Sequence, residues 1–113
     1  MSNFHIEEFK NYKVFLYGFT DENDAVEASI HIKLSNAMGI LKFCKGAVPK
    51  NYTEQKGGTK VLNLHFRANR YPHFIDILRY ERPLFFYYNK KTDVGFITTS
   101  DEPVGEGNDD RTF

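Results

Sequence analysis

Four histidines and one cysteine hold most of the acid–base, nucleophilic and metal-binding capacity of this sequence. None of the histidines stands at the close helical or hairpin spacing that metal sites use; they are His5, His31, His65 and His73. His73 precedes Asp76 by three residues, a spacing that lets a carboxylate orient an imidazole but that is also frequent by chance. Cys44 has no identified base beside it, and a single cysteine forms neither an intramolecular disulfide nor a cysteine-based zinc site. We therefore predict no catalytic residue, no metal site and no cofactor.

Motifs for phosphate binding and serine catalysis are also missing from the sequence. It contains no Gly-x-Ser-x-Gly elbow, no P-loop and no dinucleotide fingerprint. Residues 56–59 read Lys-Gly-Gly-Thr and could present backbone donors to an anion, but two glycines before a strand are typical of a turn. The sequence therefore names no reaction.

Aromatic and basic residues are adjacent in residues 85–91, which read Phe-Phe-Tyr-Tyr-Asn-Lys-Lys. Exposed aromatic rings interleaved with basic residues are typical of surfaces that bind single-stranded nucleic acid. Against that function, strand alternation directs half of these rings into the core, no RNA-binding motif is present, and the formal net charge is zero. Binding of single-stranded nucleic acid is therefore an alternative hypothesis and not the leading one.

Charge is distributed unevenly along the chain. Twelve Lys or Arg residues against three acids give residues 33–91 a net charge of +9, whereas residues 1–32 sum to −4 and residues 92–113 to −5. These charges either mix on the folded surface or form a basic face that the acidic ends screen. The residues of this candidate basic face are Arg67, Arg70, Arg79, Arg82, Lys90 and Lys91.

Alternation of apolar and polar residues predicts strands over 12–19, 26–34, 37–44 and 60–67. The clearest pattern is in 26–34, where five aliphatic residues alternate with polar ones. Residues 46–58 are polar and contain glycine and lysine, so they are predicted to form a loop.

One helix is predicted over residues 70–81. Asn69 is a candidate N-cap, Pro72 falls in the first turn, and the apolar stripe consists of Tyr71, Phe74, Ile75 and Leu78. Pro83 disfavours helical geometry at the residue before it and ends the helix. Two more strands, 84–88 and 94–99, are predicted to form a closing hairpin.

The predicted fold class is α+β, with the order β-β-β-β-α-β-β. Consecutive strands are expected to pair in one antiparallel sheet of about six strands, with the helix packed on one face. The first and fifth strands are apolar on both faces, so the sheet needs a second cover, either by rolling up or by contact with a second subunit. The candidate interface residues are Phe15, Tyr17, Phe19, Phe85 and Tyr87.

Chain length and composition predict a single domain over residues 1–100, followed by an acidic flexible tail over residues 101–113. The first ten residues include Glu7 and Glu8 and lack an apolar run, which is unlike a secretory signal, and no stretch approaches the ~20 apolar residues that a membrane span needs. We expect a cytoplasmic protein that does not contact a membrane.

Two segments of the chain resemble a group of short uncharacterised bacterial proteins. The first is Leu-Arg-x-Glu-x-Pro at 78–83, and the second is Glu-Pro-Val-Gly-Glu at 102–106. The resemblance covers about a third of the chain, implies a bacterial origin and brings no known activity or site residue. The leading hypothesis is a non-enzymatic protein–protein interaction module that acts as a homodimer. The alternatives are single-strand binding through residues 33–91 and a small ligand-binding protein with a pocket between helix and sheet.

Overall fold

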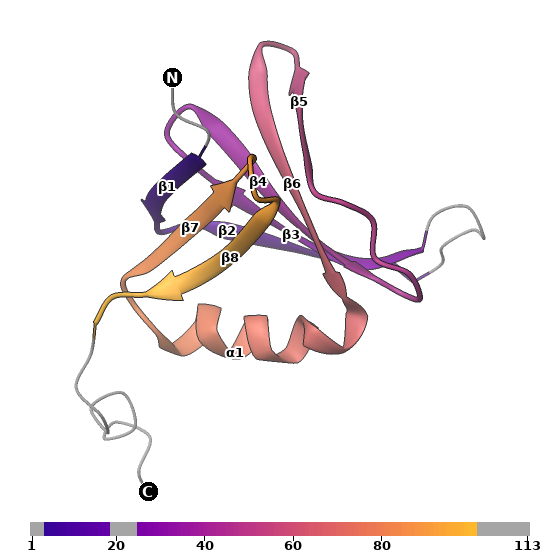
Figure 1. The fold of residues 1–113 in the computed structure, drawn as a ribbon. Helices are drawn as coiled ribbons and strands as arrows, with labels where there is room; N and C mark the ends of the chain where they lie inside the picture. The colour runs from indigo at the N-terminus through magenta and orange to yellow at the C-terminus, as the bar shows by residue number, and fades with distance from the viewer. Residues whose placement is uncertain (1–3, 19–24, 102–113) are drawn as a thin grey trace, which may run out of the picture.

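The computed structural model describes residues 4–18 and 25–101, a part of the chain that contains eight strands and one α-helix. Figure 1 shows how these elements are arranged. In chain order, the elements are β1 (Phe4–Phe9), β2 (Tyr12–Leu16), β3 (Val26–Lys33), β4 (Ala37–Cys44), β5 (Tyr52–Lys56), β6 (Thr59–Arg67), the 3-10 turn η1 (Ala68–Arg70), α1 (Tyr71–Tyr80), β7 (Leu84–Asn89) and β8 (Val94–Thr99). The predicted α+β class is confirmed. In these two ranges no helix has the length and apolar character that crossing a membrane requires.

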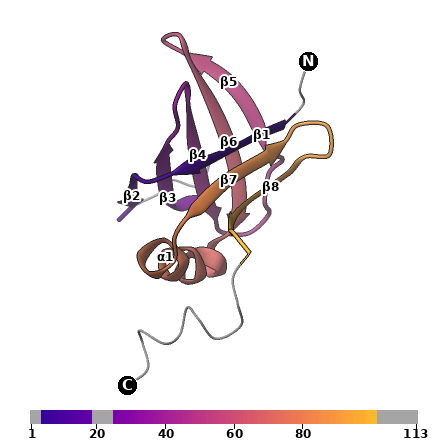
Figure 2. The same ribbon diagram turned by 90° about the vertical axis from the view of Figure 1, so that its left-hand side faces the viewer.

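The strands form two sheets, so the prediction of one six-stranded sheet is wrong. The larger sheet has the order β2-β3-β4-β6-β5, and the smaller has the order β1-β7-β8. Alternation identifies a strand but not the sheet it joins, because the period of two is the same in either sheet. Figure 2 shows β1 and β7 crossing in front of β4 and β6, which places the two sheets face to face.

The larger sheet contains one parallel pair, β4 with β6, where the sequence predicts only antiparallel neighbours. The cause is β5, which lies within the predicted loop 46–58 and pairs antiparallel with the far side of β6. The chain runs along β5 in the direction opposite to β4 and then turns back into β6, which lies between them. β6 therefore runs in the same direction as β4. The residues of β5 are mostly polar, as is usual for an edge strand, and this composition hides the strand from pattern analysis.

The smaller sheet begins with β1, a strand that the sequence prediction does not contain. It pairs antiparallel with β7, from Phe4 opposite Asn89 to Phe9 opposite Leu84. Only Phe9 of its six residues is buried, so β1 has no continuous buried stripe to reveal it. The predicted strand 12–19 is shorter in the structure, where β2 ends at Leu16.

The two sheets bury their facing sides against each other. Fully buried residues from the larger sheet include Ile30, Leu41, Phe43 and Leu64, and Phe86 of β7 is fully buried between the sheets. Two glycines permit the close approach: a Cβ atom on Gly39 of β4 would lie 2.5 Å from the Phe86 ring, and one on Gly95 of β8 would lie 2.5 Å from Leu64. Each sheet therefore has one inner face and one outer face.

The helix α1 differs from the predicted range 70–81 by one residue at each end and lies beneath both sheets in Figure 1. Pro72 occupies the first turn as predicted, but Asn69 is not the N-cap; that position is Arg70, which makes no side-chain capping bond. The predicted apolar stripe packs on the core, with the Phe74 ring 4.7 Å from that of Phe66 and 5.2 Å from that of Phe43. Residues 102–113 of the predicted tail lie outside the described residues.

Candidate functional site

The outer face of the three-stranded sheet carries a row of exposed apolar side chains. Alternation directs every second residue of β1, β7 and β8 outward, and the register aligns Ile6 with Tyr87 and Tyr87 with Phe96. Phe4 is 52 % exposed, Ile6 55 % and Phe96 39 %. We call this surface the aromatic face; its residues are Phe4, Ile6, Phe85, Tyr87, Val94 and Phe96.

Ring stacking gives the aromatic face its geometry. The centroid of the Tyr87 ring lies 4.5 Å from that of Phe96 with the planes 12° apart, and 6.0 Å from that of Phe4 with the planes 25° apart. Phe4 and Phe96 belong to the strands on opposite sides of β7, so Tyr87 has a ring on either side. The central ring therefore presents its edge, and not its face, to an incoming partner.

Opposite charges lie at the two ends of the aromatic face. Glu8 is exposed on β1 and pairs with Phe85 near the start of β7, whereas Lys90 and Lys91 are exposed directly after the end of β7. The Asn89 side chain fixes this turn, because its Oδ1 accepts hydrogen bonds from the backbone N–H groups of Lys91 (3.0 Å) and Thr92 (3.2 Å). Glu8 thus lies at one end of the face and two lysines lie at the other, with Lys10 and Arg82 exposed near Glu8 and Asp93 exposed near the lysines.

The predicted interface residues lie on two separate surfaces. Phe85 and Tyr87 belong to the aromatic face. Phe15 and Tyr17 lie on the other sheet, where the Phe15 ring lies 4.5 Å from that of His31 and the Tyr17 hydroxyl is 2.9 Å from Ser29 Oγ. Phe19 lies outside the described residues.

The predicted basic residues lie at three places. Arg67 and Arg70 are exposed just before α1, Arg79 and Arg82 are exposed at its other end, and Lys90 and Lys91 lie in the β7–β8 turn. Arg82 and Lys90 are therefore near opposite ends of β7, and the six residues do not gather into one patch.

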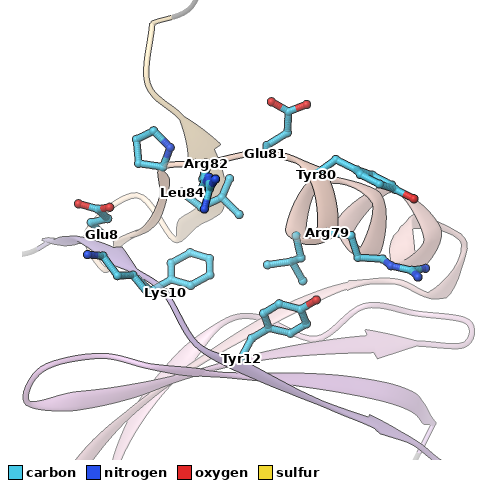
Figure 3. A pocket seen from close by; sticks show the side chains of 11 residues that line it. Glu8, Lys10, Tyr12, Arg79, Tyr80, Glu81, Arg82 and Leu84 are labelled. Atoms are coloured by element: carbon cyan, nitrogen blue, oxygen red, sulfur yellow. The ribbon is translucent and has the colours of Figure 1, made fainter. Parts of the chain in front are cut away.

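A cavity of about 730 Å³ lies where the end of α1 meets β1 and the start of β2, as Figure 3 shows. Glu8 and Lys10 line one side, Arg79 and Tyr80 line the other, and Tyr12 points from β2 toward the helix. The Leu-Arg-x-Glu-x-Pro segment supplies more than half of the lining residues. The remaining apolar wall consists of Phe9 and Leu84.

The charged and hydroxyl-bearing residues that line this cavity are Glu8, Lys10, Tyr12, Arg79, Tyr80, Glu81 and Arg82, and no histidine or cysteine is among the described residues that line it. The sequence candidates His65, His73 and Cys44 therefore lie outside this cavity. Among the described residues, no group of three or more His, Cys, Asp or Glu side chains is arranged to hold a metal ion.

Sequence reasoning missed four of the six residues of the aromatic face, namely Phe4, Ile6, Val94 and Phe96. Phe4, Ile6 and Glu8 do alternate with His5, Glu7 and Phe9, so the period of two is present in residues 4–9. The adjacent glutamates conceal the pattern because they interrupt both faces of the alternation. Phe96 falls in a predicted strand, but the sequence does not show that β8 lies beside β7 and so brings Phe96 next to Tyr87 on the outer face.

Comparison with known proteins found no match. No family model fits the chain, and neither a curated protein nor a solved structure is similar to it.

Proposed function

We propose that this protein is a small non-enzymatic interaction module that forms a homodimer through its aromatic face. The observation that carries the proposal is the row of large apolar side chains on the outer face of the three-stranded sheet, including Ile6 at 55 % exposure. Monomeric soluble proteins rarely expose contiguous apolar patches larger than a few hundred Å², and the largest patch on a protein is often a binding site. In the described part of the chain, no element covers this face.

The charges at the ends of the aromatic face favour a second copy as the partner. A twofold axis that lies between the two faces, perpendicular to β7, reverses the direction of the partner's β7, so a contact between two different residues of the face occurs twice, once on each side of the axis. Glu8 of each subunit then approaches Lys90 and Lys91 of its partner. The formal net charge of zero means that two copies do not repel each other over long range.

The size of the face indicates a weak dimer. Each strand has six residues. At about 3.3 Å per residue and about 4.8 Å between strands, the sheet has a footprint of roughly 20 by 14 Å. Such an area falls below the ~800 Å² per partner of a standard interface, so we expect association that depends on concentration.

Stacking of the rings argues against single-stranded nucleic acid as the partner. Bases stack on open ring faces, whereas Tyr87 has Phe4 and Phe96 beside its two faces. Lys90 and Lys91 supply only local basic charge, and a labelled oligonucleotide titrated at low salt tests this alternative directly.

Sedimentation velocity over a range of concentrations tests the dimer. We expect the wild-type mass to rise toward twice the 13.2 kDa of one chain. The Phe96→Lys change should keep the protein monomeric because it places a charge in a desolvated contact. Val48→Lys is the matched control, because Val48 is 38 % exposed against 39 % for Phe96 and lies outside the three-stranded sheet.

Charge reversal distinguishes the proposed arrangement from other dimers. Glu8→Lys alone should weaken the dimer, and combining it with Lys90→Glu and Lys91→Glu should restore it. A wild-type protein that stays monomeric at millimolar concentration contradicts the proposal. If Tyr17→Lys dissociates the dimer and Phe96→Lys does not, the interface lies on the five-stranded sheet.

A further inference from the structure

The outer face of the five-stranded sheet contains a polar pocket that is separate from the aromatic face and from the cavity at the helix end. Its volume is about 270 Å³, and it is lined by Tyr17, Val26, Ser29, His31, Ile40, Lys42, Glu54, Lys56 and Asn63. Outward residues of a two-sheet fold are usually exposed, yet Ser29 is 2 % and Asn63 0 % exposed. Two polar side chains are therefore buried on a face where water would normally solvate them.

Asn63 carries an acceptor without a partner. Its Nδ2 donates to Glu54 Oε2 at 3.0 Å, and its buried Oδ1 has no hydrogen-bond partner among the residues that the structure describes. The amide orientation follows from Glu54, because an ionised carboxylate only accepts and must face the NH₂ group. A buried carbonyl oxygen without a donor is costly, which favours a ligand that brings one.

The free oxygen and Glu54 together suit a cationic nitrogen. Oδ1 is two bonds from Nδ2, and Nδ2 lies 3.0 Å from Glu54 Oε2, so one nitrogen can reach hydrogen-bond distance of both oxygens. An ammonium group has three donors and a positive charge, and it matches one amide oxygen beside one carboxylate.

Two lysines provide the opposite charge on the rim of the same pocket. Lys42 Nζ donates to the Tyr52 hydroxyl at 3.3 Å, and Lys56 Nζ lies 4.0 Å from Glu54 Oε2. Each ammonium group retains donors beyond these contacts. The lysines can bind a carboxylate, and Val26 and Ile40 supply an apolar wall.

We propose that this pocket binds a small zwitterion, namely a free α-amino acid with a short apolar side chain. Its ammonium group bonds to Asn63 Oδ1 and Glu54, its carboxylate bonds to Lys42 and Lys56, and its side chain contacts Val26 and Ile40. Entry requires the tips of the lysines to turn aside, and exposed side chains do so on the picosecond to nanosecond timescale. The Lys56 side chain is 69 % exposed and is free to move in this way.

The test is a titration of the full chain followed by amide chemical shifts. L-valine should give saturable shifts in β3, β4, β5 and β6. Isobutylamine lacks the carboxylate and isovalerate lacks the ammonium group, so each should bind at least about tenfold more weakly than valine. Asn63→Leu and Lys56→Gln should each weaken valine binding by a similar factor, and Lys50→Gln, which lies outside the pocket, should leave it unchanged.

Lys56→Gln keeps the proposal testable if Asn63→Leu fails to fold, because Lys56 is exposed. Three results would overturn the proposal: no shift with valine at 50 mM or below, shifts confined to the helix-end cavity, or isobutylamine binding as tightly as valine. None of these results bears on the dimer, since the two surfaces belong to different sheets.

Discussion

Replacing Gly39 by alanine tests the face-to-face packing of the two sheets. The new Cβ would lie 2.5 Å from Phe86 Cε2 and 3.0 Å from two further ring atoms, whereas carbon atoms prefer about 3.5–4.0 Å. Phe86 is fully buried and cannot turn into solvent, so the sheets must separate locally. Overpacking of this kind costs about 1–3 kcal/mol, and we expect the free energy of unfolding in urea to fall by an amount in that range relative to the control.

Gly18→Ala is the control for this experiment. It removes the same chain flexibility, but its Cβ would lie within 4 Å of no atom of the described residues, and its backbone does not have positive φ. Replacing the Phe86 ring by the smaller leucine side chain in the Gly39→Ala background should recover part of the lost free energy of unfolding. A double-mutant cycle measures this recovery. If the Gly39 and Gly18 variants differ by less than about 0.5 kcal/mol, β4 and β7 do not pack as described.

Three further predictions concern the core, pH and the tail. Leu78→Ala should lower the free energy of unfolding by about 2–5 kcal/mol in urea titration, and a loss below about 1 kcal/mol would mean that α1 does not cover the core. Burial lowers the pKa of both His31 and His65 below the usual 6.5, and the next causes are the charges of Lys13 and then Lys42 for His31 and the charge of Lys42 for His65. The unfolded chain therefore binds more protons, so stability present above pH 6.5 should be lost as the pH falls from there through the lowered pKa values of the folded state, and a His31→Gln, His65→Gln double variant should flatten this dependence. Deleting residues 101–113 takes the net charge from 0 to +4 and should leave the melting temperature nearly unchanged while weak binding to polyphosphate appears at low salt; unfolding of the truncated chain would show that the tail packs on the domain.

The helix and most strands follow from local chemistry, so the sequence predicts them well. Pro72 and Pro83 bracket α1 in the sequence, and the prediction misses each end by only one residue. The clean alternation from Val26 onward marks β3. These signals act within a few residues and need no knowledge of the rest of the fold.

Sheet membership and the candidate sites could not be predicted, because they depend on contacts between distant residues. Ile6 and Phe96 are far apart in sequence and share one surface only because each pairs with Tyr87, which lies between them. Asn63 reads as the polar member of an alternating strand, and its hydrogen bond goes to Glu54 of an edge strand that pattern analysis misses. Period-two patterns thus show which residues share a face of one strand and leave open what lies beside that strand.

The pairing of β1 with β7 has a consequence for the nascent chain. Phe4 pairs with Asn89 and Phe9 with Leu84, so β1 finds its partner only after residue 89 has left the ribosome. At about 5–20 residues per second, this interval is on the order of ten seconds. The hairpin of β3 and β4 closes over a short loop and can form much earlier. Synthesis from the N-terminus to the C-terminus therefore favours assembly of the five-stranded sheet first. Until β7 is available, residues 4–9 remain an unpaired, partly apolar segment that a chaperone could bind.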